Sequence, residues 1–366
     1  MRGPRVRAVI AAAAAIGAAA ARAVARDGAG GYAETGGGAP GAEGAASVRW
    51  HGTTLSFDQS VTTQTLGLGA DYQSANPTYE WWLAFRPRYA LYQRGADTVS
   101  VDGWLNLYLE LTDSDTTTRR REVLLGPTYV WATYRRVLVE RRGYETSVSA
   151  GPRLIFPTDK AAFDSGQVIA LGAIAGASQR LPLRGPDARA LRGARLGATV
   201  TFNHPFSRST APVDEDLRQQ RQDVAGRLIL SDQLRGQMNV VNALNFTLSG
   251  ELQLVRRLAF SASYVFLNAW AYPVSDAALC TLRTGCVQPM SVSDPTTYRA
   301  SSWLTAALAF DATRELEVSL GYYNLASQLA PDGTRRSPFW SPSARLFLTV
   351  TGNLDVVYQR VTGRSH

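Results

Sequence analysis

A strict two-residue alternation of apolar and polar side chains constrains the fold of this chain more than any other feature. From position 244 to 254 the stretch LNFTLSGELQL places Leu, Phe, Leu, Gly, Leu and Leu on the even positions and polar residues on the odd ones. After Val-Arg-Arg, a second run begins at Leu258, again with apolar residues on alternate positions. Successive side chains of a β-strand point to opposite faces, so the pattern predicts strands with one apolar and one polar face.

The same alternation recurs along most of the chain and predicts an all-β protein of about twelve strands. No segment shows sustained helical periodicity. Strands of soluble proteins are mostly about five or six residues long, whereas a tilted strand needs about 9 to 11 residues to cross a membrane. The predicted runs reach that second length. They are 53–66, 80–91, 101–111, 123–134, 145–156, 168–178, 194–203, 242–254, 258–269, 300–310, 315–323 and 344–358.

The connections between these runs alternate between long and short, which distinguishes a membrane barrel from a soluble sandwich. In an up-and-down topology, successive connections lie at opposite ends, so all the long ones fall at one end. Greek-key sandwiches mix the two ends, whereas outer-membrane barrels have short periplasmic turns and long extracellular loops. We therefore predict a closed up-and-down antiparallel transmembrane β-barrel of about 12 strands. The long connections are 67–79, 112–121, 157–167, 204–241, 272–299 and 324–343.

The N-terminal segment has the three parts of a secretory signal peptide. A basic leader, MRGPRVR, precedes a 14-residue apolar run from Ala8 to Ala21, and Ala-Arg-Ala at 21–23 fits a small-x-small cleavage site. A short membrane anchor is the alternative interpretation. We predict a signal peptide over residues 1–23, a flexible Gly/Ala-rich periplasmic lead-in over 24–52 and the barrel over 53–366.

The charge balance does not indicate a nucleic-acid partner. The formal net charge of +8 overstates the basicity of the mature chain, because four arginines leave with the predicted signal peptide. The remaining basic residues are scattered along the chain and form no patch in sequence. We expect no nucleic-acid binding.

From about Thr53 to Tyr358, the sequence resembles the bacterial outer-membrane β-barrel superfamily. The PTDK stretch at 157–160, which follows Leu-Ile-Phe, is similar to a motif of barrels linked to the uptake of aromatic compounds. The chain departs from the usual pattern at its end, where QRVTGRSH follows Tyr358 instead of a closing aromatic residue. The resemblance implies the outer membrane of a Gram-negative bacterium, contact with its lipid, and insertion by the general barrel-assembly machinery.

The polar phase of the alternation supplies candidate residues for the barrel interior. Charge placement in a polar pore tunes selectivity, but a narrow interior also pairs its charges simply to fill itself. Bulky aromatic residues on the same phase, such as Trp82 and Trp303, constrict the interior in either case. The predicted pore-lining residues are Arg86, Arg88, Asp102, Trp104, Glu110, Arg153, Arg195, Glu251 and Arg345.

Two further sets of residues lie in or near the long loops. Cys280 and Cys286 are spaced C-x5-C, and an exported chain oxidises such a pair, so we predict a disulfide; free thiols and a metal site are the alternatives. The stretch 119–121 is Arg-Arg-Arg, and further arginines occur at 335–336. Guanidinium groups bind phosphate, so contact with lipopolysaccharide is a hypothesis beside that of an ordinary solvated loop.

His204 is the one candidate for catalysis. It stands in the sequence FNHPFS, where a strand is predicted to meet the longest loop, and Ser207 follows three residues later. Some twelve-stranded outer-membrane phospholipases use His and Ser on the barrel wall, with one residue between them. In a regular strand, Ser207 would lie on the opposite face from His204, out of hydrogen-bond reach. A histidine that anchors the loop is the competing interpretation.

These observations favour a channel that passes small solutes by passive diffusion. No nucleotide-binding or ion-coupling motif occurs, so we expect no cofactor, and the solute is not readable from the residues. The alternatives are an outer-membrane lipid hydrolase that uses His204, and a closed structural or adhesion barrel whose loops carry the function.

Overall fold

The computed structural model describes residues 49–68, 78–112, 121–141, 143–183, 191–210, 218–222, 228–232, 238–273, 279–281, 285–287, 297–328, 335–341 and 343–362. The predicted signal peptide and nearly all of the predicted lead-in lie outside these residues. The end of the predicted lead-in, residues 49–52, forms a turn. Among the described residues, no helix has both the length and the apolar character that spanning a membrane would require.

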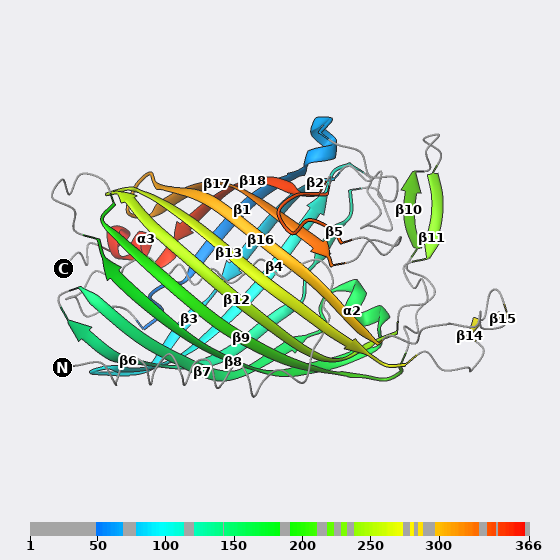
Figure 1. Ribbon diagram of the computed structural model, residues 1–366, viewed down its shortest axis with the longest axis horizontal. Helices are drawn as coiled ribbons and strands as arrows, with labels where there is room; N and C mark the ends of the chain where they lie inside the picture. Colours follow the sequence, from blue (N-terminus) through cyan, green and yellow to red (C-terminus); the bar gives the residue numbers. More distant parts are fainter. Residues whose placement is uncertain are drawn as a thin grey trace.

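The main sheet is a barrel of long, tilted strands (Figure 1). Its strands are β1 (Thr54–Thr62), β2 (Tyr79–Arg86), β3 (Arg88–Arg94), β4 (Asp97–Glu110), β5 (Val123–Leu125), β6 (Thr128–Arg141), β7 (Tyr144–Phe156), β8 (Gln167–Pro182), β9 (Gly193–Ser207), β12 (Val240–Val255), β13 (Leu258–Ala271), β16 (Tyr298–Asp311), β17 (Leu316–Ser327) and β18 (Arg345–Asn353).

Every neighbouring pair in this sheet is antiparallel, and β18 pairs with β1 to close the ring. β2 and β3 form one continuous barrel position, interrupted at Pro87, and both pair with β4. β5 and β6 are likewise separated only by Gly126 and Pro127, and both also pair with β4. The barrel therefore has twelve strand positions, and the predicted closed up-and-down barrel is confirmed.

The two faces of the wall reverse the arrangement of a soluble protein. Large apolar side chains are exposed on the outer face, among them Leu248 at 62% and Leu320 at 60%. Polar side chains are buried on the inner face, among them Ser60, Glu80 and Asn106. An apolar exterior around a polar interior is the pattern of a transmembrane barrel, because lipid surrounds the wall.

The two ends of the barrel differ in the length of their connections. At the turn end, β3 meets β4, β6 meets β7, β12 meets β13 and β16 meets β17 through two to four residues. At the loop end lie the long connections, which contain the 3-10 helix η1 (Thr63–Leu66) and the helix α2 (Lys160–Asp164). By the rule for such barrels, the turn end is periplasmic and the loop end is extracellular.

Two of the predicted loops contain short hairpins that the sequence analysis did not anticipate. Within 204–241, β10 (Arg218–Gln222) pairs with β11 (Leu228–Asp232), and within 272–299, β14 (Leu279–Thr281) pairs with β15 (Gly285–Val287). Both stand beyond the loop end of the barrel in Figure 1. Their strands are three to five residues long, too short for an alternation to be recognised.

The prediction that the last strand runs to Tyr358 is wrong. β18 ends at Asn353, and the helix α3 (Leu354–Val361) follows at the turn end. Leu354, Val357, Tyr358 and Val361 recur at helical spacing, so the apolar period changes at Asn353 from two to about 3.6. The helix is held against the turn that precedes the first strand, since His51 contacts Asp355 and the ring of Trp50 packs edge-on against Tyr358. The first predicted strand also ends early, at Thr62, where η1 begins.

The backbones of β6 and β7 approach each other closely at Gly151. A Cβ atom on Gly151 would lie 1.7 Å from the carbonyl oxygen of Ala132, so only glycine fits this position. Pro152 follows and has no backbone N–H to donate, and the pairing of the two strands is interrupted between Arg153 and Ala150. The regular backbone pairing of β7 with β6 is therefore interrupted at Gly151 and Pro152.

Candidate functional site

The strand register places all nine predicted interior residues on the inner face. Arg88 lies opposite Asp102, and Arg195 lies opposite Glu251. Trp104 and Glu110 are buried, at 2% and 0% exposure, so they shape the interior without contacting bulk water. The other seven are partly exposed. Whether these residues line a conducting pore stays a prediction.

One side of the interior carries a column of guanidinium and aromatic groups, which we call the aromatic stack: Arg86, Trp104, Tyr129 and Arg153. The Arg86 guanidinium lies 4.9 Å from the centre of the Trp104 ring, and the Arg153 guanidinium lies 4.5 Å from the Tyr129 ring. The two rings stack on each other at 5.4 Å and 24°. They meet because Trp104 and Tyr129 are direct partners on β4 and β6. Each cation–π contact contributes about 0.5–2 kcal/mol, depending on desolvation.

Tyr129 is not among the interior residues predicted from the sequence. The run predicted over 123–134 is really β5 and β6, separated at Gly126 and Pro127. Inward residues are even-numbered in β5, where Leu124 is buried, and odd-numbered in β6, where Tyr129 is buried. The change of phase at Gly126 and Pro127 is the sequence signal that identifies Tyr129 as an inward residue.

A second cluster joins β1, β2 and β18 near the closure of the barrel. Glu80 accepts hydrogen bonds from both terminal nitrogens of Arg345, the Nη2 bond at 3.0 Å. Glu80 also accepts a 3.0 Å bond from the indole of Trp82, whose ring stacks on Tyr108 at 4.8 Å. Both partners of the ion pair are largely buried, with side-chain exposures of 17% and 4%. The charges are therefore compensated within the cluster.

Other interior charges are also paired with opposite charges. Arg88 approaches Asp102 to 3.4 Å, and Arg135 contacts Glu145. Arg195 and Glu251 are direct cross-strand partners. These pairs place opposite charges side by side on the inner face.

The opposite side of the interior is lined by small side chains, many of them hydroxyls. Its strands are β8, β9, β12, β13 and β16, and their register gives the inward set. The same strands also carry a few large or charged inward residues, among them Arg195, Glu251 and Trp303, so this side is richer in small residues than the side of the aromatic stack but not free of bulk. The inward residues on this small side include Gly176, Ser178, Gly197, Thr199, Thr201, Asn245, Thr247, Ser249, Ser261, Ser263, Thr305 and Ala307.

The PTDK residues anchor α2 at the loop end. The Thr158 hydroxyl donates to the carbonyl of Gly126 at 2.6 Å, and Lys160 pairs with Glu122. Asp159 caps the helix by accepting a 2.6 Å bond from the backbone N–H of Ala162. Burial raises the pKa of the Asp159 carboxyl above its ordinary value. The motif therefore ties the β7–β8 connection to the break between β5 and β6.

Two substitutions at Asp159 separate its capping role from its charge. Asp159→Ala is expected to destabilise the barrel by about 1 kcal/mol through loss of the cap. Asp159→Asn keeps a capping oxygen. Because the folded-state pKa is raised, the native carboxyl contributes most stability when protonated, and wild-type stability should fall as pH rises from the unfolded pKa through the folded one. Urea unfolding across acidic to neutral pH should show this fall in wild type and not in Asp159→Asn. A parallel pH dependence in both would contradict the assignment.

The structure places His204 in a strand, and its role as an anchor of the following loop stays a prediction. It lies within β9, which continues to Ser207, and its side chain is on the outer face with Phe202. Its Nδ1 is 2.8 Å from the Oδ1 of Asn242. The next residue on the same face is Phe206, whose ring packs edge-on against the imidazole. Phenylalanine thus takes the place where a phospholipase of this kind carries its serine, and Ser207 lies on the other phase.

The remaining candidates rest on the extracellular connections. Cys280 and Cys286 are direct backbone partners in the β14–β15 hairpin. The disulfide between them stays a prediction. Arg119 and Arg120 lie outside the described residues, and Arg335 is exposed. Within the described part of the chain, no cluster of three or more His, Cys, Asp or Glu could hold a metal ion.

Comparisons with known proteins concern the fold. No model of a protein family matches the chain, and no curated protein matches it. An outer membrane channel from Pseudomonas putida F1 is 10% identical, with 86% of this chain and 98% of that one covered and a TM-score of 0.44. A mutant of the TodX monoaromatic hydrocarbon channel (9% identity, 82% and 88% covered) and the NanC porin (7%, 82% and 97%) both have a TM-score of 0.34. The solved structures that resemble this chain thus include bacterial outer-membrane β-barrel channels and porins.

Proposed function

We propose that the chain is an outer-membrane channel through which small solutes diffuse passively. The observation that carries the proposal is the enclosed polar face: twelve long strands close into a ring with apolar side chains outside and polar side chains inside. The difference between the two sides of the interior supports a solute path along the small side.

The paired charges support solutes without strong net charge. Within Glu80–Arg345, Arg88–Asp102 and Arg135–Glu145 the opposite charges neutralise each other, and the aromatic rings offer faces on which planar or sugar-like groups can stack. Small polar or aromatic compounds are the class that fits this lining. We propose no cofactor, since diffusion follows the concentration gradient.

Planar bilayer recording tests the proposal directly. The folded protein should give discrete conductance steps in potassium chloride, with a reversal potential close to zero across a salt gradient because the interior charges compensate. Protein unfolded by heat before addition is the control and should insert no steps. A folded barrel that inserts and stays silent would contradict the channel and favour the closed structural barrel.

The proposed membrane surroundings follow from the apolar outer face of the barrel. The exposed leucines place membrane lipid around the barrel, and export through the signal peptide followed by insertion by the barrel-assembly machinery would deliver it there. The exposed Arg335 supports contact of the loops with lipopolysaccharide phosphate. Hydrolysis of lipid through His204 has no support from its neighbours, since Phe206 packs on the imidazole.

A further inference from the structure

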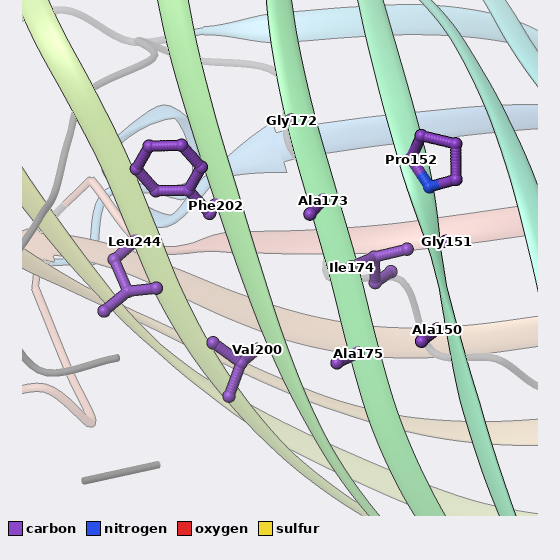
Figure 2. A pocket seen from close by; sticks show the side chains of 10 residues that line it. All are labelled: Ala150, Gly151, Pro152, Gly172, Ala173, Ile174, Ala175, Val200, Phe202 and Leu244. Carbon is purple, nitrogen blue, oxygen red and sulfur yellow. The ribbon is translucent and has the colours of Figure 1, made fainter. Parts of the chain in front are cut away.

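The outer wall carries an apolar groove that the proposed channel does not use. It has a volume of about 460 Å³ and lies across β7, β8, β9 and β12 (Figure 2). This volume falls within the range of about 300–1,000 Å³ that is typical of small-molecule sites. Its lining side chains are Pro152, Ala173, Ala175, Val200, Phe202 and Leu244.

The register shows that this groove opens on the lipid-facing side. Pro152, Ala173, Phe202 and Leu244 form one cross-strand row. Two residues from Ala173 along β8, on the same face, Leu171 is 44% exposed. The groove is therefore part of the surface that surrounding hydrocarbon covers.

The groove arises from a contrast in side-chain size between neighbouring strands. On β8, Ala173 and Ala175 rise little above the backbone and form the floor. Phe202 and Leu244 stand on one side of it, and Pro152 stands on the other, as Figure 2 shows. Leu244 is itself only 3% exposed and forms a cluster with Ala243 and Ala269, against which Phe202, Phe246 and Trp270 pack. The wall next to the floor is therefore well packed, and the groove is a fixed feature of the surface.

A polar pair lies just beyond the groove toward the loop end. His204 lies two residues beyond Phe202 on β9, and Asn242 lies two residues beyond Leu244 on β12, both on the outer face and toward the loop end. Each step is roughly 7 Å. Their side chains are hydrogen-bonded to each other at 2.8 Å. Arg208, directly after β9 on the extracellular side, is exposed. Polar groups on a lipid-facing wall are costly in hydrocarbon, so their place indicates the level of the head groups.

We propose that the groove binds one acyl chain of a lipopolysaccharide molecule, whose phosphate-bearing head group is held by His204 and Arg208. The groove runs from the middle of β7, β8 and β9 toward the loop end, and the half of the wall nearer the loop end is the half that the outer leaflet surrounds. Guanidinium binds phosphate well, and imidazole donates a hydrogen bond to it. The site is separate from the solute path, because it is on the opposite face of the wall.

The test is native mass spectrometry of the full-length barrel in mild detergent, titrated in separate arms with rough-type lipopolysaccharide and with phosphatidylglycerol. Ala173→Trp fills the groove with an indole, and Ala175→Phe fills it from a second position if the first variant fails to fold. Ala262→Trp is the matched control, since it places the same side chain on the outer face of β13, away from the groove. A difference in gel migration between unheated and heated samples shows that each variant is folded.

The expected result is one tightly bound lipopolysaccharide on wild type and on Ala262→Trp, and at least ten-fold weaker binding by the groove-filling variants. His204→Leu together with Arg208→Leu should weaken the binding of lipopolysaccharide and leave the groove intact. Equal binding by Ala173→Trp and wild type would overturn the proposal. So would a preference for phosphatidylglycerol, which would assign the groove to a different lipid. Conductance in planar bilayers should be unchanged in the groove variants, so failure of this site and failure of the channel are separable.

Discussion

Glu80→Gln is expected to destabilise the barrel by about 3–5 kcal/mol. Arg345 would lose a buried carboxylate that it now contacts through both terminal nitrogens, and removal of one partner of a buried pair leaves an uncompensated charge. The Trp82 indole keeps an acceptor in the glutamine amide oxygen, so the charge and not the hydrogen bond is what changes. Urea unfolding in lipid vesicles, followed by tryptophan fluorescence, measures the loss.

The same substitution should shift ion selectivity toward anions, because the cation that remains is no longer compensated. Two controls define the effect. Glu80→Gln combined with Arg345→Gln should recover most of the stability and return the reversal potential toward zero. Arg360→Gln removes a partner from the exposed pair with Glu315 at the turn end and should change neither property. Equal stability of Glu80→Gln and wild type would show that the pair contributes nothing to the closure of β18 on β1.

The architecture was predictable because lipid imposes a simple pattern on a barrel. Each strand must present one apolar face over its length, so the run from Leu244 alternates strictly and the run from Leu258 keeps apolar residues on every even position to Phe266. The interior assignments of Arg195 and Glu251 follow from the same phase, and the register places these two residues opposite each other. Where the period of two holds, sequence alone determines which face a residue occupies.

The prediction failed where that period stops. The last strand was extended past Asn353 because Val357 and Tyr358 are apolar, although their spacing is helical. Tyr129 was missed because Gly126 and Pro127 shift the phase within one apparent run. The groove could not be predicted at all: Ala173, Phe202 and Pro152 are far apart in sequence, and only the pairing of β7, β8 and β9 brings their sizes into contrast.

Trp104→Ala should both enlarge the conducting path and weaken the fold. Trp104 is 2% exposed and lies between the Arg86 guanidinium and the Tyr129 ring, so its removal leaves a cavity where the aromatic stack was continuous. Truncation of a buried tryptophan costs about 3–5 kcal/mol. The indole also fills space on the inner face, and an alanine there should give larger conductance steps in planar bilayers.

Trp81→Ala is the matched control, because Trp81 is on the neighbouring strand but faces outward at 40% exposure. Its loss should leave the conductance of each step unchanged and cost less stability. Trp104→Phe keeps an aromatic ring against Tyr129 and should lie between Trp104→Ala and wild type in both measurements. If Trp104→Ala destabilises the barrel as expected and yet leaves conductance equal to wild type, the aromatic stack supports the wall alone, and the solute path runs entirely along the small side of β8, β9 and β12. An increase in conductance instead means that the aromatic stack narrows the path, because the substitution removes only the volume of the Trp104 indole from the inner face.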